Sequence, residues 1–165
     1  MQITELDREA LRLALASQIA GEVRFDPVAR ALYSTDASVH QMEPLGVVVP
    51  RDRQDILRVL DVCRRLRIPV TVRGGGTSQA GQAIGEGLQI DISKHYHRIL
   101  EVNTEEAWGR VEPGIVLDEL SVQLAPLGMR FATDTSCRHP MSDLRDAGSN
   151  TKAVHPAVLV RSLLK

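Results

Sequence analysis

The chain has 165 residues, of which 43% are hydrophobic and 25% charged, and its net charge is −1. This balance is typical of a globular domain with a single core and excludes a disordered chain. A charge so close to zero argues against nucleic acid or an anionic membrane surface as a partner. No segment is long and apolar enough to cross a bilayer, so we expect no integral membrane segment.

Two features predict a cytoplasmic protein. The N-terminus reads MQITELDREALRLALASQIAG, with acidic residues where a secretory signal would carry positive charge. The two cysteines, Cys63 and Cys137, lie far apart and form no CxxC pair, which is typical of reduced thiols.

The first elements along the chain are predicted to be helices. Apolar residues at helical spacing predict a first helix that ends by Gly21. Asp26 followed by Pro27 predicts the start of a short second helix that ends near Leu32.

Residues 46–73 predict a β-α-β unit. The run GVVVP at 46–50 predicts a buried strand that stops at the proline, and residues 70–73 predict a second buried strand. Between them Asp52 caps a predicted helix. The apolar stripe expected on this helix consists of Ile56, Leu57, Leu60, Cys63 and Leu66. The two strands are most simply parallel, with a right-handed crossover.

The next segments predict strands and a further helix. Residues 88–92 (LQIDI) alternate apolar and polar side chains, as a half-buried strand does, with Asp91 as a charge at the strand edge. Strands at 99–102 and 108–111, joined by a turn, continue it as a meander. A helix over 116–127, closed by Gly128, precedes a strand at 129–132. The fold class predicted is α+β: a β-α-β unit, a meander and an α-β portion.

The most informative stretch is VRGGGTSQAG at residues 72–81. Three glycines directly after a strand can adopt backbone angles forbidden to other residues, and their N–H groups can turn toward an anion. Thr77 and Ser78 add hydroxyl donors, so the loop suits a diphosphate. It lacks the Gly-Lys-Ser/Thr of ATPase loops and the helix that follows a G-x-G-x-x-G fingerprint. A plain tight turn between strands is the alternative.

Four motifs in this order resemble the FAD-binding domain of the vanillyl-alcohol oxidase and p-cresol methylhydroxylase superfamily. They are YSTDAS at 33–38, VVVPRDR at 47–53, RGGGTSQAG at 73–81 and VEPG at 111–114. Within it the chain is most similar to the FAD-linked 2-hydroxy-acid dehydrogenases of the D-lactate, glycolate and D-2-hydroxyglutarate type. The resemblance implies three parts: an N-terminal helical segment (1–32), a partial FAD-binding domain (33–139) and a divergent tail (140–165).

The resemblance also implies a cofactor and its contacts. The cofactor is FAD, held non-covalently because the loop has no histidine to which flavin could be attached. The implied contacts are Gly74, Gly75, Gly76, Thr77, Ser78, Gln82 and Asp134. Thr133 stands where the family usually has proline.

The resemblance implies an oxidoreductase acting on a 2-hydroxy acid, but the family's flavin-ring segment and substrate domain have no counterpart after Ser136. We therefore assign no catalytic residue and expect this truncated chain to be inactive alone. The alternative is a non-catalytic remnant that binds a phosphate-containing ligand weakly, or nothing.

Other candidate sites are weaker. His95 and His97 have spacing that a metal could use on a strand, but no third ligand is evident, so we interpret them as a surface turn and predict no metal site. Cys137, beside Arg138 and His139, is interpreted as an ordinary thiol. The arginines of residues 51–67 are interpreted as a solvated helix face, paired with Asp52, Asp55 and Asp61.

Overall fold

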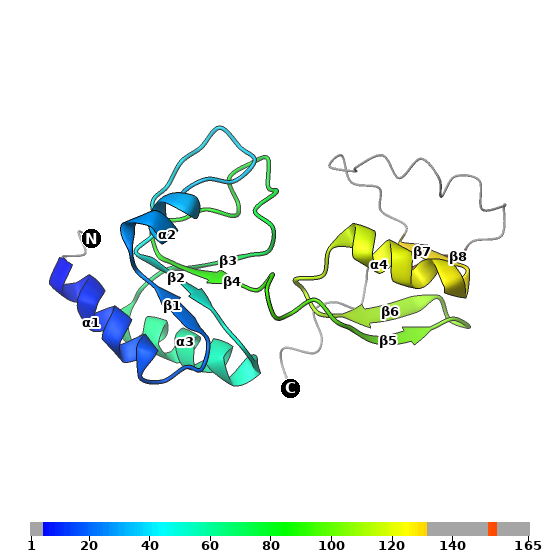
Figure 1. The fold of residues 1–165 in the computed structure, drawn as a ribbon, viewed down its shortest axis with the longest axis horizontal. Helices are drawn as coiled ribbons and strands as arrows, with labels where there is room; N and C mark the ends of the chain where they lie inside the picture. Colours follow the sequence, from blue (N-terminus) through cyan, green and yellow to red (C-terminus); the bar gives the residue numbers. More distant parts are fainter. Residues whose placement is uncertain (1–4, 132–151, 155–165) are drawn as a thin grey trace. The chain divides into compact units, whose positions relative to one another are not determined.

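We analysed a computed structural model of the protein, which describes residues 5–131 and 152–154. The chain divides into two compact units, Met1–His95 and Tyr96–Lys165 (Figure 1). Among the described residues, no helix is long and apolar enough to pass through a membrane.

The first unit is built on a four-stranded sheet with the order β1-β2-β4-β3. Its strands are β1 (Glu22–Arg24), β2 (Gly46–Val49), β3 (Val70–Arg73) and β4 (Leu88–Asp91). Strands β2, β4 and β3 are parallel, whereas β1 pairs antiparallel with β2. The predicted parallel arrangement of β2 and β3 is confirmed, but β4 lies between them.

Three helices accompany this sheet: α1 (Glu5–Ala16), α2 (Pro27–Leu32) and α3 (Arg53–Leu66). Helices α2 and α3 begin as predicted. The side chain of Asp26 accepts a hydrogen bond from the backbone N–H of Ala29 at 2.9 Å, and that of Asp52 accepts one from Asp55 at 3.0 Å. Such caps satisfy N–H groups that have no partner within the first turn.

The buried face of α3 shares only Cys63 with the predicted apolar stripe. The buried residues are Asp55, Val59, Val62 and Cys63, whereas Leu57, Leu60 and Leu66 are each at least 40% exposed. Asp55 fixes this orientation, because its carboxylate accepts hydrogen bonds from three backbone N–H groups outside the helix. Each bond is 2.9 Å long, and the donors are Ala20, Gly21 and Arg51. The interpretation of Asp55 as a solvated partner for arginine was therefore wrong.

Two predictions about strand burial were also wrong. Strand β4 is buried along its whole length, including the polar Gln89 and Asp91, because it is a central strand with neighbours on both sides. Strand β3 was expected to be buried but is an edge strand, with Val70 36% and Val72 55% exposed. Because β4 joins the first sheet in parallel, the predicted meander is limited to the two strands that follow.

The second unit contains the hairpin of β5 (Ile99–Asn103) and β6 (Trp108–Val111). Helix α4 (Leu117–Leu124) runs into a 3₁₀ turn, η1 (Ala125–Leu127), which Gly128 ends in the left-handed conformation at φ 65°. Strand β7 (Met129–Phe131) pairs in parallel with β8 (Lys152–Val154). The core of this unit is formed by Leu120, Leu124 and Met129.

The predicted mixture of helices and strands is confirmed in both units. Strands β1 and β8 were not predicted, because three-residue strands with polar residues carry no clear alternation. Strand β8 lies within the predicted tail, residues 140–165; the rest of that tail lies outside the described residues.

Candidate functional site

The glycine-rich segment at residues 74–78 is a surface loop that directly follows β3, as predicted. It starts at the carboxyl end of β3, where Arg73 pairs in register with Asp91, the last residue of β4. The region beyond the carboxyl ends of parallel strands is where open α/β sheets commonly bind ligands. The loop therefore occupies a position suited to binding.

Two glycines of this loop have different structural roles. Gly76 has φ +69°, and a Cβ placed there would lie 1.9 Å from Nη2 of Arg73. Gly76 is therefore required by the backbone itself. A Cβ on Gly74 would meet no atom within 4 Å, so the absence of a side chain there leaves open space next to the backbone.

The backbone N–H and carbonyl groups of the loop differ in their hydrogen bonding. Among the residues that the structure describes, the N–H groups of residues 74–78 donate no hydrogen bond. Two carbonyls, in contrast, accept hydrogen bonds. The backbone N–H of Ile92 donates to the Arg73 carbonyl at 3.0 Å, and that of Ala37 donates to the Gly76 carbonyl at 3.1 Å. A run of unpaired donors beside fixed carbonyls is the arrangement expected of an anion-binding loop.

The hydroxyl of Ser78 is occupied within the loop. It donates a short hydrogen bond to Oε1 of Gln82 and accepts one from the Gln82 backbone N–H at 3.1 Å. The Ser78 hydroxyl and the Gln82 side chain thus shape the turn. The side chain of Thr77 is exposed and forms no hydrogen bond to any described residue. The seventh predicted contact, Asp134, lies outside the described residues.

The segment that precedes β2 lies beside the loop. Figure 1 shows the two connections, residues 34–45 and 74–87, side by side beyond the sheet. The carboxylate of Asp36 links them, because it accepts hydrogen bonds from Ser38 at 2.9 Å and from the backbone N–H of Ala83 at 3.3 Å. The hydrogen bonding of Ser38 holds the pKa of Asp36 below its ordinary value.

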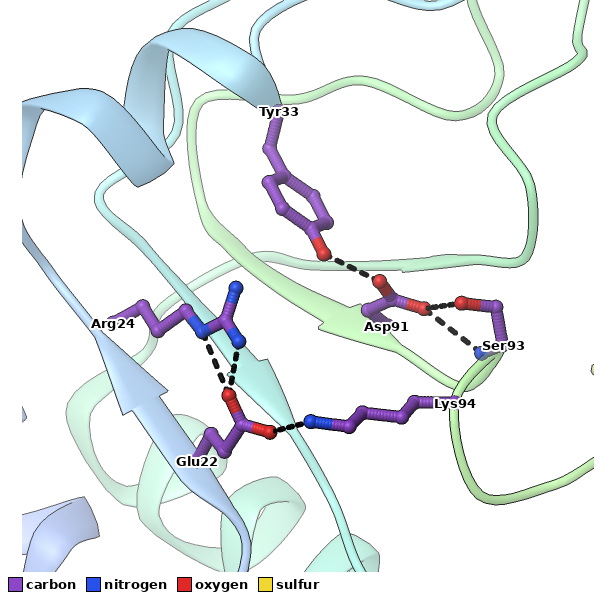
Figure 2. A network of polar contacts seen from close by, with 6 residues as sticks. All are labelled: Glu22, Arg24, Tyr33, Asp91, Ser93 and Lys94. Atoms are coloured by element: carbon purple, nitrogen blue, oxygen red, sulfur yellow. Dashed lines mark hydrogen bonds and ion pairs between the residues drawn. The ribbon is translucent and has the colours of Figure 1, made fainter.

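Asp91 lies in a polar network at the end of β4 (Figure 2). It was expected to be a charge at the strand edge, but it is 8% exposed and all its bonds are internal. Its carboxylate accepts a short hydrogen bond from the Tyr33 hydroxyl and two from Ser93, at 2.8 Å from the N–H and 2.6 Å from the hydroxyl. Burial, together with this bond to Asp91, raises the pKa of Tyr33 to about 12.

An ion pair connects the turn after β4 to strand β1 (Figure 2). Lys94 forms a close ion pair with Glu22, whose carboxylate also accepts a hydrogen bond from Nε of Arg24 at 2.8 Å. These contacts lower the pKa of Glu22, with the bond from Lys94 as the largest cause. The network thus fixes the turn that carries Ser93 and hence the bonds from Ser93 to Asp91.

A hollow of about 220 Å³ opens between this network and the glycine loop. Its lining combines the start of the loop with charged and hydroxyl side chains: Leu32, Tyr33, Arg73, Gly74, Gly75, Asp91 and Ser93. The motif at 33–38 and the loop at 74–78, far apart in sequence, therefore border one hollow. No pattern in the sequence indicated that Asp91 and Ser93 would join them, because a lone acid after an apolar run is usually solvated.

The described residues contain no group of three or more side chains suited to holding a metal ion. His95 lies in a turn, as predicted, and His97 follows it before β5. Cys63 is buried and forms no disulfide with a described residue. Cys137 and His139 lie outside the described residues.

The sequence profile of the FAD binding domain matches residues 44–142. The chain is 39% identical over 131 residues to the D-2-hydroxyglutarate dehydrogenase of Pseudomonas putida, a match that covers 78% of this chain and 13% of that protein. It is 29% identical over 170 residues to the glycolate oxidase subunit GlcD of Escherichia coli, which covers 99% of this chain and 34% of that subunit. The chain thus spans only a small part of these relatives.

Solved structures with the same fold include p-cresol methylhydroxylase, at a TM-score of 0.61 and 14% identity over 76% of this chain and 26% of that one. Another is 4-ethylphenol oxidase from Gulosibacter chungangensis, at a TM-score of 0.63 and 19% identity over 76% of this chain and 26% of that one. At this level of identity the comparison concerns the fold alone.

Proposed function

Because the chain belongs to the FAD binding domain family, whose cofactor is FAD, we propose that residues 74–78 hold the diphosphate of FAD through their backbone N–H groups. The observation that carries this proposal is the run of N–H groups without an acceptor among the described residues. Successive backbone N–H groups without a protein acceptor can bond an anion, and a diphosphate offers several acceptor oxygens to such a run.

The shape and charge of the surroundings support the same assignment. The open space at Gly74 allows a ligand to approach the backbone closely, which a side chain would prevent. Arg73 places a guanidinium beneath the loop, and the resulting positive charge favours an anion. The side chain of Thr77 is exposed at the loop and would add a hydroxyl donor.

The variant Gly74→Ala tests the proposal directly. The added methyl meets no protein atom within 4 Å, so we expect an unchanged free energy of unfolding. In the space reserved for the diphosphate it would block close approach, so FAD should bind at least about tenfold more weakly, whereas riboflavin, which has no diphosphate, should be unaffected. Titration followed by flavin fluorescence measures both ligands. Equal FAD affinity in the variant and the wild type would contradict the proposal.

For a full-length protein that contains this domain, we propose oxidation of a 2-hydroxy acid. Support comes from relatives whose names are D-2-hydroxyglutarate dehydrogenase and glycolate oxidase subunit GlcD. A bound flavin supplies the hydride acceptor in such chemistry, and the residues proposed here would hold and orient it. We assign no residue to substrate binding or to proton transfer.

By itself this chain is proposed to bind FAD weakly and non-covalently and to lack turnover. Hydride transfer requires a substrate carbon held in near-attack geometry, and no described residue is assigned to that task. The test adds D-2-hydroxyglutarate, glycolate or D-lactate anaerobically to the flavin-loaded chain. Bleaching of the flavin absorbance would overturn the proposed inactivity. Flavin that stays with acid-precipitated protein would overturn non-covalent binding. The second candidate, a remnant without affinity for FAD, predicts no fluorescence change on titration.

A further inference from the structure

Arg73 is the last residue of β3, and its side chain turns back under the loop that follows. Its Nη1 donates to the backbone carbonyls of Tyr33 and Thr35, each at 3.3 Å, and of Ala83 at 3.5 Å. The guanidinium carbon lies 4.9 Å from the centre of the Tyr33 ring, so the cation also stacks on that ring. One side chain therefore joins three segments that are distant in sequence.

The same guanidinium fills the space beneath Gly76. A Cβ atom on Gly76 would lie 1.9 Å from Nη2 and 2.8 Å from Cζ of Arg73. The Gly76 carbonyl in turn accepts a hydrogen bond from the N–H of Ala37, within the segment that Arg73 holds. The left-handed turn at Gly76 is thus supported from below by Arg73 and from the side by Ala37.

Tyr33, on which Arg73 stacks, is itself fixed by strand β4. Its hydroxyl donates to Asp91, and its carbonyl accepts a hydrogen bond from Nε2 of Gln89 at 3.1 Å. Gln89 and Asp91 are two positions apart on β4 and therefore project from the same face of the sheet. Both are buried, so the platform beneath Arg73 belongs to the buried centre of the first unit.

We propose that Arg73 is a positioning residue, which sets the shape of the diphosphate loop from the platform of Tyr33, Gln89 and Asp91. The inference rests on the proposed function of residues 74–78 and assigns the residue that organises them. Lysine cannot replace it, because an ammonium group has no plane to stack on the Tyr33 ring and no second nitrogen to fill the space at Gly76 while the first bonds the carbonyls.

The experiment compares Arg73→Lys and Tyr33→Phe with the wild type. Arg30→Lys is the matched control, because Arg30 also donates to a backbone carbonyl, that of Pro44 at 2.9 Å, and has a side chain only 15% exposed. Affinities for FAD, ADP and riboflavin are measured by titration. Hydrogen exchange at the Ala37 amide, which bonds the Gly76 carbonyl, reports the loop without any ligand.

In Arg73→Lys we expect FAD and ADP to bind about tenfold more weakly and the Ala37 amide to exchange about tenfold faster, the loss typical of a hydrogen bond from a charged donor. Riboflavin affinity should not change. Tyr33→Phe keeps the ring but loses the bond to Asp91, so about threefold changes in the same direction are expected. Arg30→Lys should change none of these values.

Unchanged Ala37 exchange in Arg73→Lys would overturn the positioning role, as would an equal loss of riboflavin and ADP affinity. Failure of the wild type to bind FAD or ADP would overturn the proposed function instead. In that case the Ala37 amide still decides whether Arg73 shapes the loop. If Arg73→Lys does not fold, Tyr33→Phe provides the same comparison.

Discussion

The hydroxyl of Tyr33 donates a hydrogen bond to the carboxylate of Asp91, and this bond joins two residues 58 positions apart in the sequence. It links the segment before β2 to the end of the central strand, next to the hollow that borders the glycine loop. Because Asp91 is also held by Ser93, its carboxylate is committed to structure rather than free to act as a general base.

This bond predicts a loss of stability at high pH. The pKa of Tyr33 in the folded state, about 12, lies above the value of 10.0 for a free tyrosine. The protonated phenol therefore contributes stability that is fully present below pH 10.0 and is lost as the pH rises through about 12. Urea unfolding of the wild type and of Tyr33→Phe at several pH values measures this contribution. The alkaline loss should be smaller in the variant, and identical profiles would refute it.

Glu112 predicts a loss of stability at low pH in the second unit. Its carboxylate accepts hydrogen bonds from the Arg98 side chain, the closest at 2.7 Å, and from the Arg98 backbone N–H at 3.0 Å. The bonds from the Arg98 side chain lower the pKa of Glu112 below its ordinary value of 4.5. Its contribution is therefore present above pH 4.5 and is lost as the pH falls through the lowered pKa.

The measurement follows unfolding by the fluorescence of Trp108, the single tryptophan, which lies in this unit. The variant Glu112→Gln should be less stable than the wild type near neutral pH, and the difference should shrink on acidification. A difference that is independent of pH would show that the Glu112 charge contributes nothing.

Replacing Asp55 by asparagine should lower the free energy of unfolding strongly, although the change is conservative. In Asp55→Asn one carboxylate oxygen is replaced by an NH₂ donor that faces backbone N–H groups, so we expect a loss of about 2–3 kcal/mol in the free energy of unfolding. Asp61→Asn, on the exposed face of the same helix, is the control. Asp61 pairs only with exposed arginines among the described residues, so its loss should be at most about 0.5 kcal/mol. Similar losses measured by urea unfolding would contradict the assignment of Asp55 as a structural anchor.

Gly76→Ala and Gly75→Ala form a second matched pair. Alanine at 76 must adopt φ +69° and would collide with Arg73, so we expect a loss of about 1–2 kcal/mol in stability. A Cβ on Gly75 would meet only Thr77 Cγ2, at an ordinary 3.7 Å, so its variant should retain nearly full stability. Urea unfolding of the two variants measures the contrast, and equal stabilities would rule out a left-handed turn at Gly76.

We expect the Cys63 thiol to resist alkylation in the native protein. Its side chain is buried, and burial raises the pKa of the thiol to about 11, so little thiolate is available to react. Iodoacetamide at mildly alkaline pH, followed by mass mapping of peptides, should leave Cys63 unmodified in the native protein and modify it fully in urea. Rapid native labelling would show that the Cys63 thiol is not buried.

The sequence by itself determined the elements that local chemistry controls. Asp26 and Asp52 start helices because their side chains satisfy N–H groups three residues ahead, and Gly128 ends one because it tolerates a positive φ. The loop at 74–78 was also predictable, because consecutive glycines after a strand leave few alternatives.

Only the tertiary structure decided which polar groups are buried and which apolar groups are exposed. The order of strands placed β4 in the centre and β3 at the edge, so LQID was buried and VTVR partly exposed, opposite to what their own patterns favour. Asp55 turned most of the apolar stripe of α3 outward, because its carboxylate accepts from the distant N–H groups of Ala20 and Gly21 as well as from nearby Arg51. Burial of Asp91 likewise depends on the Tyr33 hydroxyl 58 positions away. Such pairings depend on long-range contacts that no local pattern encodes, because hydrogen-bond partners meet only after the chain has folded.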